Sequence, residues 1–233
     1  MAKRGGSRHY RRLTVAPTLP VEGRKRIHWL LSPNPGPHPK NQSLALGSLL
    51  RDQLHLGTDL REIKRLLNAG HIKVDGKTVR EARYAIGLMD VIEAPKAGKV
   101  WRMQIVGNRL GPKEVDAAQA KFKLCKVVGK NTVPGGKISV TTHDGRTMLA
   151  DNKVKVGATL KMSLPAFKLS GQMPLAAGVR CLVTEGKHAG ETAMLEKIIE
   201  RVGSMDSEAQ LKSGAESFVT VTKYLFVVDD EFN

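Results

Sequence analysis

The sequence predicts an α+β protein that is built from several small domains. Two amphipathic helix patterns and a hairpin signal follow one another between residues 43 and 93. From Val100 onward, apolar and polar residues alternate with the period of two that is typical of β-strands. A chain of 233 residues is also long enough for two or three modest hydrophobic cores. We expect four parts with the boundaries 1–42, 43–94, 95–172 and 173–233.

The first two regular elements are expected to be short amphipathic helices. Ser43 is the expected N-cap of the first, and Asp59 and Glu62 have the spacing of a capping box at the start of the second. Gly70 is expected to end the second helix as a left-handed C-cap. The apolar residues of each helix recur on one face and are expected to be buried: Leu46, Leu49, Leu50 and Leu54, then Leu60, Ile63, Leu66 and Leu67.

The second helix is expected to present a basic face to solvent. This face repeats at i, i+3, i+4 and i+7 and consists of Arg61, Lys64, Arg65 and Asn68. The Asp75-Gly76 dipeptide that follows predicts a type I′ turn, because both central positions of that turn need a positive φ. The strands of the hairpin add Lys73, Lys77 and Arg80. Two interpretations stay open, an RNA-binding surface and the ordinary solvated surface of a small domain.

Basic charge is concentrated in two parts of the chain, whose formal net charge is +16. Residues 1–42 and 94–170 carry net charges of +8 and +11, whereas residues 43–93 are nearly neutral at +1 and residues 171–233 carry −4. Clustering of this kind indicates a polyanionic partner, because contacts with phosphates release bound counterions.

The first 42 residues form a basic, extended N-terminal arm in this interpretation, because their apolar residues are too sparse for a core. A disordered tail and an extension that becomes ordered on RNA both fit the composition. The prolines between Ser32 and Asn41 favour a stretched spacer that holds the arm away from the next domain. For His28 and Trp29 we weigh stacking on a base against a hydrophobic clip onto the neighbouring domain. The candidate RNA contacts of the arm are Arg4, Arg8, Arg11, Arg12, Arg24, Lys25 and Arg26.

The middle of the chain predicts a small β-rich domain whose outward residues are mostly Lys. Strands are expected at residues 100–105, 122–128, 137–142, 147–149, 154–156 and 159–162. Residues 178–198 then show a strand, a turn around Gly186 and Gly190, and a returning strand. Residues 217–228 supply two more β segments.

Several classes of protein are disfavoured by what the sequence contains. Cys125 and Cys181 are far apart, so we expect buried free thiols and neither a disulfide framework nor a Cys-rich zinc site. No apolar run approaches the roughly 20 residues that span a membrane, and the basic start is not followed by the hydrophobic segment of a signal peptide. We expect a soluble intracellular protein with no metal, cofactor or small-molecule substrate.

The run from Asp59 to Ile92 closely resembles the S4-type RNA-binding module in its order of helix, Gly-His pair, strand, Asp-Gly turn and strand. This resemblance implies that the paired helices rest their basic face against folded RNA. Residues 178–198 resemble a KOW motif, which implies a small KOW-like or SH3-like β-barrel as the C-terminal domain.

The order of basic arm, S4-type module, Lys-rich β domain and KOW-like domain resembles the ribosomal protein S4e family of the archaeal and eukaryotic small subunit, in its archaeal form. The resemblance implies a structural constituent of the cytoplasmic ribosome that binds small-subunit rRNA beside neighbouring ribosomal proteins and has no catalytic role. An RNA-modifying enzyme of the pseudouridine synthase type would need an active-site Asp in a pocket. Asp116, Asp144 and Asp151 lie in no motif of that kind. A free translation or stress regulator with the same module is the third interpretation.

Overall fold

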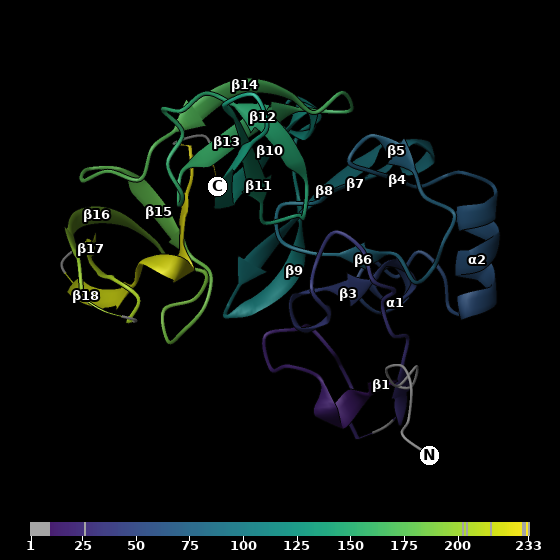
Figure 1. Cartoon of the computed structure of the whole chain (residues 1–233). Helices are drawn as coiled ribbons and strands as arrows, with labels where there is room; N and C mark the ends of the chain where they lie inside the picture. Colours follow the sequence, from purple (N-terminus) through teal and green to yellow (C-terminus); the bar gives the residue numbers. More distant parts are fainter. Residues whose placement is uncertain are drawn as a thin grey trace, which may run out of the picture. The chain divides into compact units, whose positions relative to one another are not determined.

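A computed structural model describes residues 10–25, 27–201, 203, 205–214, 216–229 and 232 of the chain (Figure 1). Backbone contacts divide the chain into two compact units, Met1–Gln104 with Arg109–Ala120, and Ile105–Asn108 with Lys121–Asn233. Strands supply most of the regular structure, and the described α-helices are α1 (Leu46–Asp52) and α2 (Leu60–Asn68). Short 3-10 helices lie at Arg12–Thr14, Lys40–Gln42, Pro95–Ala97, Gln119–Lys121 and Thr222–Tyr224. No helix of the described residues is long and apolar enough to cross a membrane.

Helix α1 begins later than the sequence suggests. Its N-cap is Ala45 and not the predicted Ser43, because the chain first forms the short strand β3 (Leu44–Ala45), which pairs with β6 (Ala85–Ile86). Leu54 lies beyond the end of α1 but still packs against the core. The other predicted apolar residues of α1 are fully buried.

Helix α2 begins and ends where the sequence predicts. Asp59 is its N-cap, but the Asp59 side chain makes no capping bond. The Glu62 carboxylate accepts from the backbone N–H and the hydroxyl of Thr58, at 2.8 and 3.0 Å, and also from the backbone N–H of Asp59. These bonds lower the pKa of Glu62. At the other end Gly70 has a φ of +74°, and the N–H groups of Gly70 and His71 donate to the carbonyls of Leu67 and Leu66. This pattern is a Schellman motif.

The sheet of the first unit has the order β5-β4-β7-β8-β9. Asp75 and Gly76 have φ angles of +50° and +75° and connect β4 to β5, which confirms the type I′ turn. Asp75 is buried, and its carboxylate accepts the Val91 N–H at 3.0 Å, which offsets the cost of burial. The turn therefore also holds the return strand β7 in place. The sheet consists of β4 (Lys73–Val74), β5 (Lys77–Thr78), β7 (Val91–Ala94), β8 (Lys99–Val106) and β9 (Arg109–Glu114), of which β9 was not predicted.

The N-terminal segment contributes to a core, contrary to the expectation that its apolar residues are too sparse. Strands β1 (Tyr10–Arg11) and β2 (Trp29–Leu30) pair antiparallel. Val15, Leu19 and Val21 are buried in the same hydrophobic cluster as the two helices. The prediction failed because these few apolar residues pack against partners that are far away in sequence.

The proline-rich spacer also packs onto the module and does not stand away from it as expected. His38 is buried, and its Nε2 lies 3.0 Å from both carboxylate oxygens of Asp90. Asp90 Oδ2 in turn accepts the Gly87 N–H at 2.9 Å. A residue in the middle of the spacer is therefore held at the turn that precedes β7.

The second unit contains two five-stranded antiparallel sheets. The first has the order β12-β11-β10-β13-β14, and its strands are β10 (Phe122–Val133), β11 (Lys137–Thr142), β12 (Thr147–Ala150), β13 (Thr159–Ser163) and β14 (Lys168–Met173). Residues 154–156 are not the predicted strand, because Val154 donates to Asp151 O and the chain turns at Gly157, whose φ is +89°. β14 was missed. Lys123 also corrects the expectation of outward Lys, since its side chain is buried.

The second sheet has the order β18-β17-β16-β15-β19. Its strands are β15 (Arg180–Val183), β16 (Thr192–Ile199), β17 (Glu208–Ser213), β18 (Glu216–Val221) and β19 (Leu225–Val227). The predicted strand, turn and returning strand are β15 and β16, and Gly186 and Gly190 between them both have a positive φ. Strand β17 was not predicted. Cys125 and Cys181 are free and buried, as expected.

Candidate nucleic-acid interface

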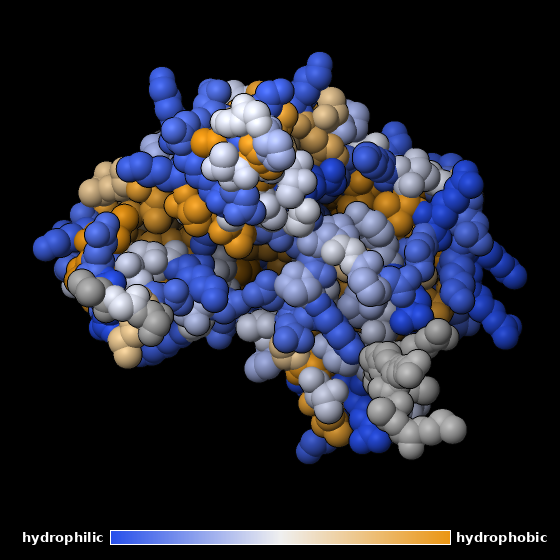
Figure 2. Space-filling model, in the orientation of Figure 1, coloured by the Kyte–Doolittle hydropathy of each residue, from blue (hydrophilic) through white to orange (hydrophobic). Residues whose placement is uncertain are grey.

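The predicted basic face of α2 is exposed. Ile63 and Leu67 are completely buried beneath the helix, and Leu60 and Leu66 pack against the same core at partial exposure. The helical period therefore turns the polar residues outward, and Figure 2 shows hydrophilic residues covering the part of the surface where α2 lies. The exposed polar residues of this face are Arg61, Lys64, Arg65 and Asn68.

The cations of this face are available to a ligand. Within the described part of the chain, no ion pair or hydrogen bond engages the side chains of Arg61 and Lys64. Arg65 acts on Glu62 through its charge alone and contributes to the lowered pKa of that carboxyl. A guanidinium offers a planar fork of donors that fits a phosphate, whereas Lys64 offers a point charge.

The β4–β5 hairpin continues the basic surface beyond the helix. The Schellman motif directs the chain from α2 into the hairpin, and a Cβ on Gly70 would lie 3.4 Å from the Thr78 side chain of β5. Lys77 and Arg80 are exposed and Lys73 is half-buried. The exposed Lys96 lies 2.9 Å from His71 Nε2 and was missed, because no local pattern connects it with the helix.

The cations of the N-terminal segment divide into two groups. Arg11 and Lys25 are exposed, whereas Arg12 is buried and Arg24 is half-buried. The Arg12 guanidinium donates to Asp52 Oδ2 at 3.2 Å and to Glu22 O, and that of Arg24 donates to Val15 O and Ala16 O at 2.9 and 3.1 Å. These two residues therefore hold the segment together, and we leave them out of the proposed interface. The predicted contacts Arg4, Arg8 and Arg26 lie outside the described residues.

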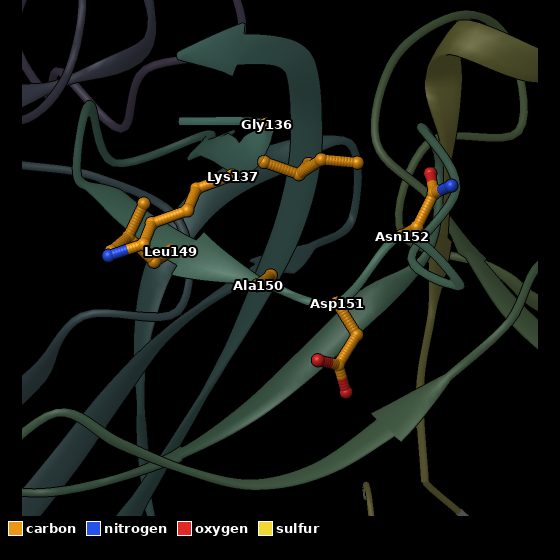
Figure 3. A pocket seen from close by; sticks show the side chains of 7 residues that line it. Gly136, Lys137, Leu149, Ala150, Asp151 and Asn152 are labelled. Carbon is orange, nitrogen blue, oxygen red and sulfur yellow. The ribbon is translucent and has the colours of Figure 1, made fainter. Parts of the chain in front are cut away.

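The candidate acids Asp116, Asp144 and Asp151 do not form an enzyme-like site. An open pocket of about 370 Å³ is lined by Gly136, Lys137, Ile138, Leu149, Ala150, Asp151 and Asn152. The polar side chains of this pocket point in different directions and do not meet at one point (Figure 3). Asp116 is exposed on the first unit, and Asp144 is buried. Of the three candidate acids only Asp151 lines this open pocket, and the other polar side chains of the lining do not converge with it as an acid–base site requires.

Cys125, His143 and Asp144 lie close enough to hold a metal ion, with ligand atoms within 4.8 Å of one another. The Asp144 carboxylate is already engaged by two cations, Arg146 Nε at 2.9 Å and Lys123 Nζ at 3.5 Å. His143 Nδ1 accepts the Lys126 N–H. These contacts explain why the three side chains lie close together. A metal ion here would be repelled by the two positive charges beside Asp144, so we assign no metal to the cluster.

Comparison with known proteins places the chain in a family. A family model described as "Ribosomal family S4e" matches residues 103–169, and a model of the S4 domain matches residues 53–92. The chain is 34% identical over 230 residues to "Small ribosomal subunit protein eS4" of Methanothermobacter thermautotrophicus, covering 98% of this chain and 95% of the relative. The chain belongs to the ribosomal S4e family. The eS4 protein of Thermoplasma acidophilum is 40% identical over 223 residues, covering 94% of this chain and 91% of that protein.

A solved S4e structure supports the same assignment. The crystal structure of the 30S ribosomal protein S4e from Thermoplasma acidophilum matches with a TM-score of 0.72 and 37% identity, covering 81% of this chain and 96% of that chain. The S4-domain match includes α2, Gly70 and the β4–β5 hairpin, which are the elements that carry the predicted basic face. The predicted resemblances to the S4-type module and the S4e family are thus confirmed.

Proposed function

We propose that this chain is a structural constituent of the small ribosomal subunit that binds and stabilises small-subunit rRNA. The observation that carries the proposal is the exposed cationic face of α2 inside an S4 domain, in a chain that is similar over nearly its whole length to proteins named as small-subunit constituents. Its partners are the rRNA and neighbouring small-subunit proteins, and its location is the cytoplasmic ribosome.

The net charge of each part of the chain indicates which partner it contacts. The S4 domain and the exposed cations of the N-terminal segment bind phosphates. Residues 94–170, which include most of the Lys-rich sheet β10–β14, add the long-range field of their net charge of +11. We assign the sheet β15–β19 to a KOW-like or SH3-like barrel domain within residues 173–233. This domain carries a net charge of −4 over residues 171–233, so its contacts are expected to favour proteins over RNA.

Sedimentation tests the assignment directly. Tagged protein expressed in an archaeal host is expected to migrate with the small subunit in a sucrose gradient. Protein that remains at the top of the gradient would contradict a structural role and favour a free regulator.

The α2 face is expected to be the main RNA contact of the S4 domain. Replacing Arg61 and Arg65 with Ala keeps good helix formers on an exposed face, so the melting temperature should change little. Affinity for a small-subunit rRNA transcript should fall by about 1 kcal/mol or more per lost contact. The slope of log affinity against log salt should become shallower by about one per lost phosphate. Filter binding across a salt series measures both quantities.

A matched control removes the same charge elsewhere. Arg201 and Lys212 are exposed in the acidic C-terminal part, and Arg201 forms an ion pair with Glu208 that is worth little at the surface. The Arg201→Ala/Lys212→Ala variant is expected to bind like the wild type. Equal weakening in both double variants would show that net charge and not the α2 face determines binding.

A further inference from the structure

Trp29 stands out among the aromatic residues of the chain. All ten Phe, Trp and Tyr residues lie in the described part, and Trp29 alone is exposed, with 49% of its surface accessible. The other tryptophan, Trp101, is 7% exposed. An aromatic ring of this size normally contributes its area to a core or an interface, so its exposure calls for a ligand.

The strand register explains which side chains face outward. In the β1–β2 pair Tyr10 is opposite Leu30 and Arg11 is opposite Trp29. Because neighbouring residues of a strand point to opposite faces, the pair Tyr10 and Leu30 turns into the core while Arg11 and Trp29 turn out. The hydrophobic clip that we weighed for His28 and Trp29 is thus supplied by Leu30, and the indole keeps about half of its surface accessible to solvent.

The indole stands on a firmly held backbone. Arg12 binds the backbone of both His28 and Trp29. Its N–H donates to His28 O at 3.0 Å, and its Nε donates to Trp29 O at 3.4 Å. The same guanidinium binds Asp52 in α1. The His28 ring meets the indole edge to face with ring centres 4.4 Å apart. The ring is therefore supported before any ligand arrives, which lowers the entropy cost of binding.

The charges around the ring favour RNA over protein. The Arg11 guanidinium carbon lies over the indole ring, 5.9 Å from its centre, and Lys25 is exposed in the same segment. Residues 1–42 hold nine Lys or Arg and a single acid, Glu22. A nucleotide satisfies both features at once, because its base offers a flat face to the indole and its phosphate pairs with the cation beside it.

We infer that Trp29 and Arg11 form a stacking site for an unpaired base of RNA, a second contact that is separate from the phosphate-binding face of α2. The inference rests on the proposed function, because it takes small-subunit rRNA as the source of the base. Unpaired bases in loops and bulges are the parts of RNA that aromatic side chains recognise, whereas the α2 face offers positive charge. Loss of the indole and loss of an α2 cation should respond differently to salt, since stacking releases no counterions whereas a phosphate contact does.

The test measures binding of the full chain to a transcript of small-subunit rRNA at several salt concentrations. Trp29→Ala is expected to weaken binding by about 5-fold to 150-fold without changing the salt slope. Trp29→Phe should restore most of the affinity because it keeps a stacking ring. Leu13→Ala is the matched control, since Leu13 is 62% exposed in the same segment and has no aromatic ring. Melting curves of all variants should coincide with that of the wild type.

Fluorescence provides a second readout in which Trp29 itself stays in place. In a Trp101→Phe variant Trp29 is the only tryptophan, and the transcript should quench its emission with the same midpoint as binding. Unquenched emission at saturation would overturn the stacking site.

The outcomes separate this inference from the proposed function. Wild-type protein that fails to bind the transcript would overturn both. Wild-type binding with equal affinity of Trp29→Ala would overturn the stacking site alone. A Trp29→Ala variant that binds naked rRNA normally but fails to enter the small subunit would show that Trp29 contacts a protein, and would also overturn it.

Discussion

The Asp144 side chain is engaged by several partners in the second unit. Its carboxylate is completely buried, lies 3.5 Å from the equally buried Lys123 Nζ, and accepts from Arg146 Nε at 2.9 Å and from the Thr142 hydroxyl. Burial alone would raise the pKa of Asp144, but Lys123, the Thr142 hydroxyl, His143 and Arg146 together hold it at about 2. A buried pair of this kind is costly to break, because the remaining charge has no water around it.

Replacing Asp144 with Asn is therefore expected to destabilise the protein strongly. The loss should be about 3–5 kcal/mol in the free energy of unfolding, since Lys123 would stay buried without its counterion. Urea unfolding followed by circular dichroism measures this loss. The matched control is Asp151→Asn, which changes an exposed carboxylate directly after β12 and should be nearly neutral. A similar stability of both variants would show that Lys123 finds another partner.

The same carboxylate predicts a pH dependence with a definite sign. Its pKa is lower in the folded protein, about 2, than the value of 3.8 for a free Asp, so protonation favours the unfolded chain. Its stabilisation is complete above about pH 5 and is lost as the pH falls toward 2, by about 2 kcal/mol. The difference between wild type and Asp144→Asn should shrink over this window. A constant difference would mean that Asp144 titrates normally.

Single residues were predictable where the reason for their position is local. Arg61 and Lys64 face outward because Ile63 and Leu67 face inward, and the helical period shows this directly. Arg12 was expected on the RNA and is buried, because its partner Asp52 lies 40 residues away. Nothing in the neighbouring sequence distinguishes it from the exposed Arg11.

At the scale of elements, the attachment of the proline-rich spacer depends on one close approach. A Cβ on Gly87 would come within 3.0 Å of three ring atoms of His38. The same glycine donates its N–H to Asp90, which holds the His38 ring. Gly87 thus leaves room for the ring and helps to orient its carboxylate partner.

Gly87→Ala is expected to cost about 1–3 kcal/mol of stability, because the new methyl group overlaps the His38 ring. Most of this cost should disappear in a His38→Ala background, which removes the overlapping atoms, and a double-mutant cycle in urea unfolding measures the coupling. Gly36→Ala is the control, since a Cβ there would meet Ala85 Cβ at an ordinary 3.7 Å. Additive effects of Gly87→Ala and His38→Ala would contradict the overlap.

Elements that are marked by residues with special backbone conformations were predicted well. Strands that depend on pairing with a neighbouring strand, such as β9 and β14, were missed. The Gly70 stop and the Asp75-Gly76 turn each need a positive φ, which few sequences supply. Strand β9 contains Gly111 and Pro112, which argue against a strand. Pro112 is tolerated because β9 is the last strand of its sheet, where a missing N–H leaves no partner unsatisfied. Strand β14 has no buried residue and therefore no alternating pattern.

At the scale of the whole molecule, the chain carries more positive charges than its fold pairs with carboxylates. The net charge is +16, and the cations of the α2 face stay unpaired in the described chain while buried ones such as Arg12 and Lys123 have counterions. Unpaired like charges repel one another, so the free protein stores electrostatic energy that a polyanion releases. The C-terminal part, at −4 over residues 171–233, does not share this property.

Binding to rRNA should consequently fade with salt. If six to ten phosphates are contacted, affinity should fall by about 10³ to 10⁵ between 50 and 200 mM salt, because each contact releases condensed counterions. Titrations of an rRNA transcript in potassium chloride give the slope, and its value counts the phosphates. Arg61→Ala/Arg65→Ala should lower that slope by about two, whereas Trp29→Ala should shift the line without tilting it. A nearly flat line for the wild type would mean that shape and stacking, and not the cationic surface, hold this protein on its RNA.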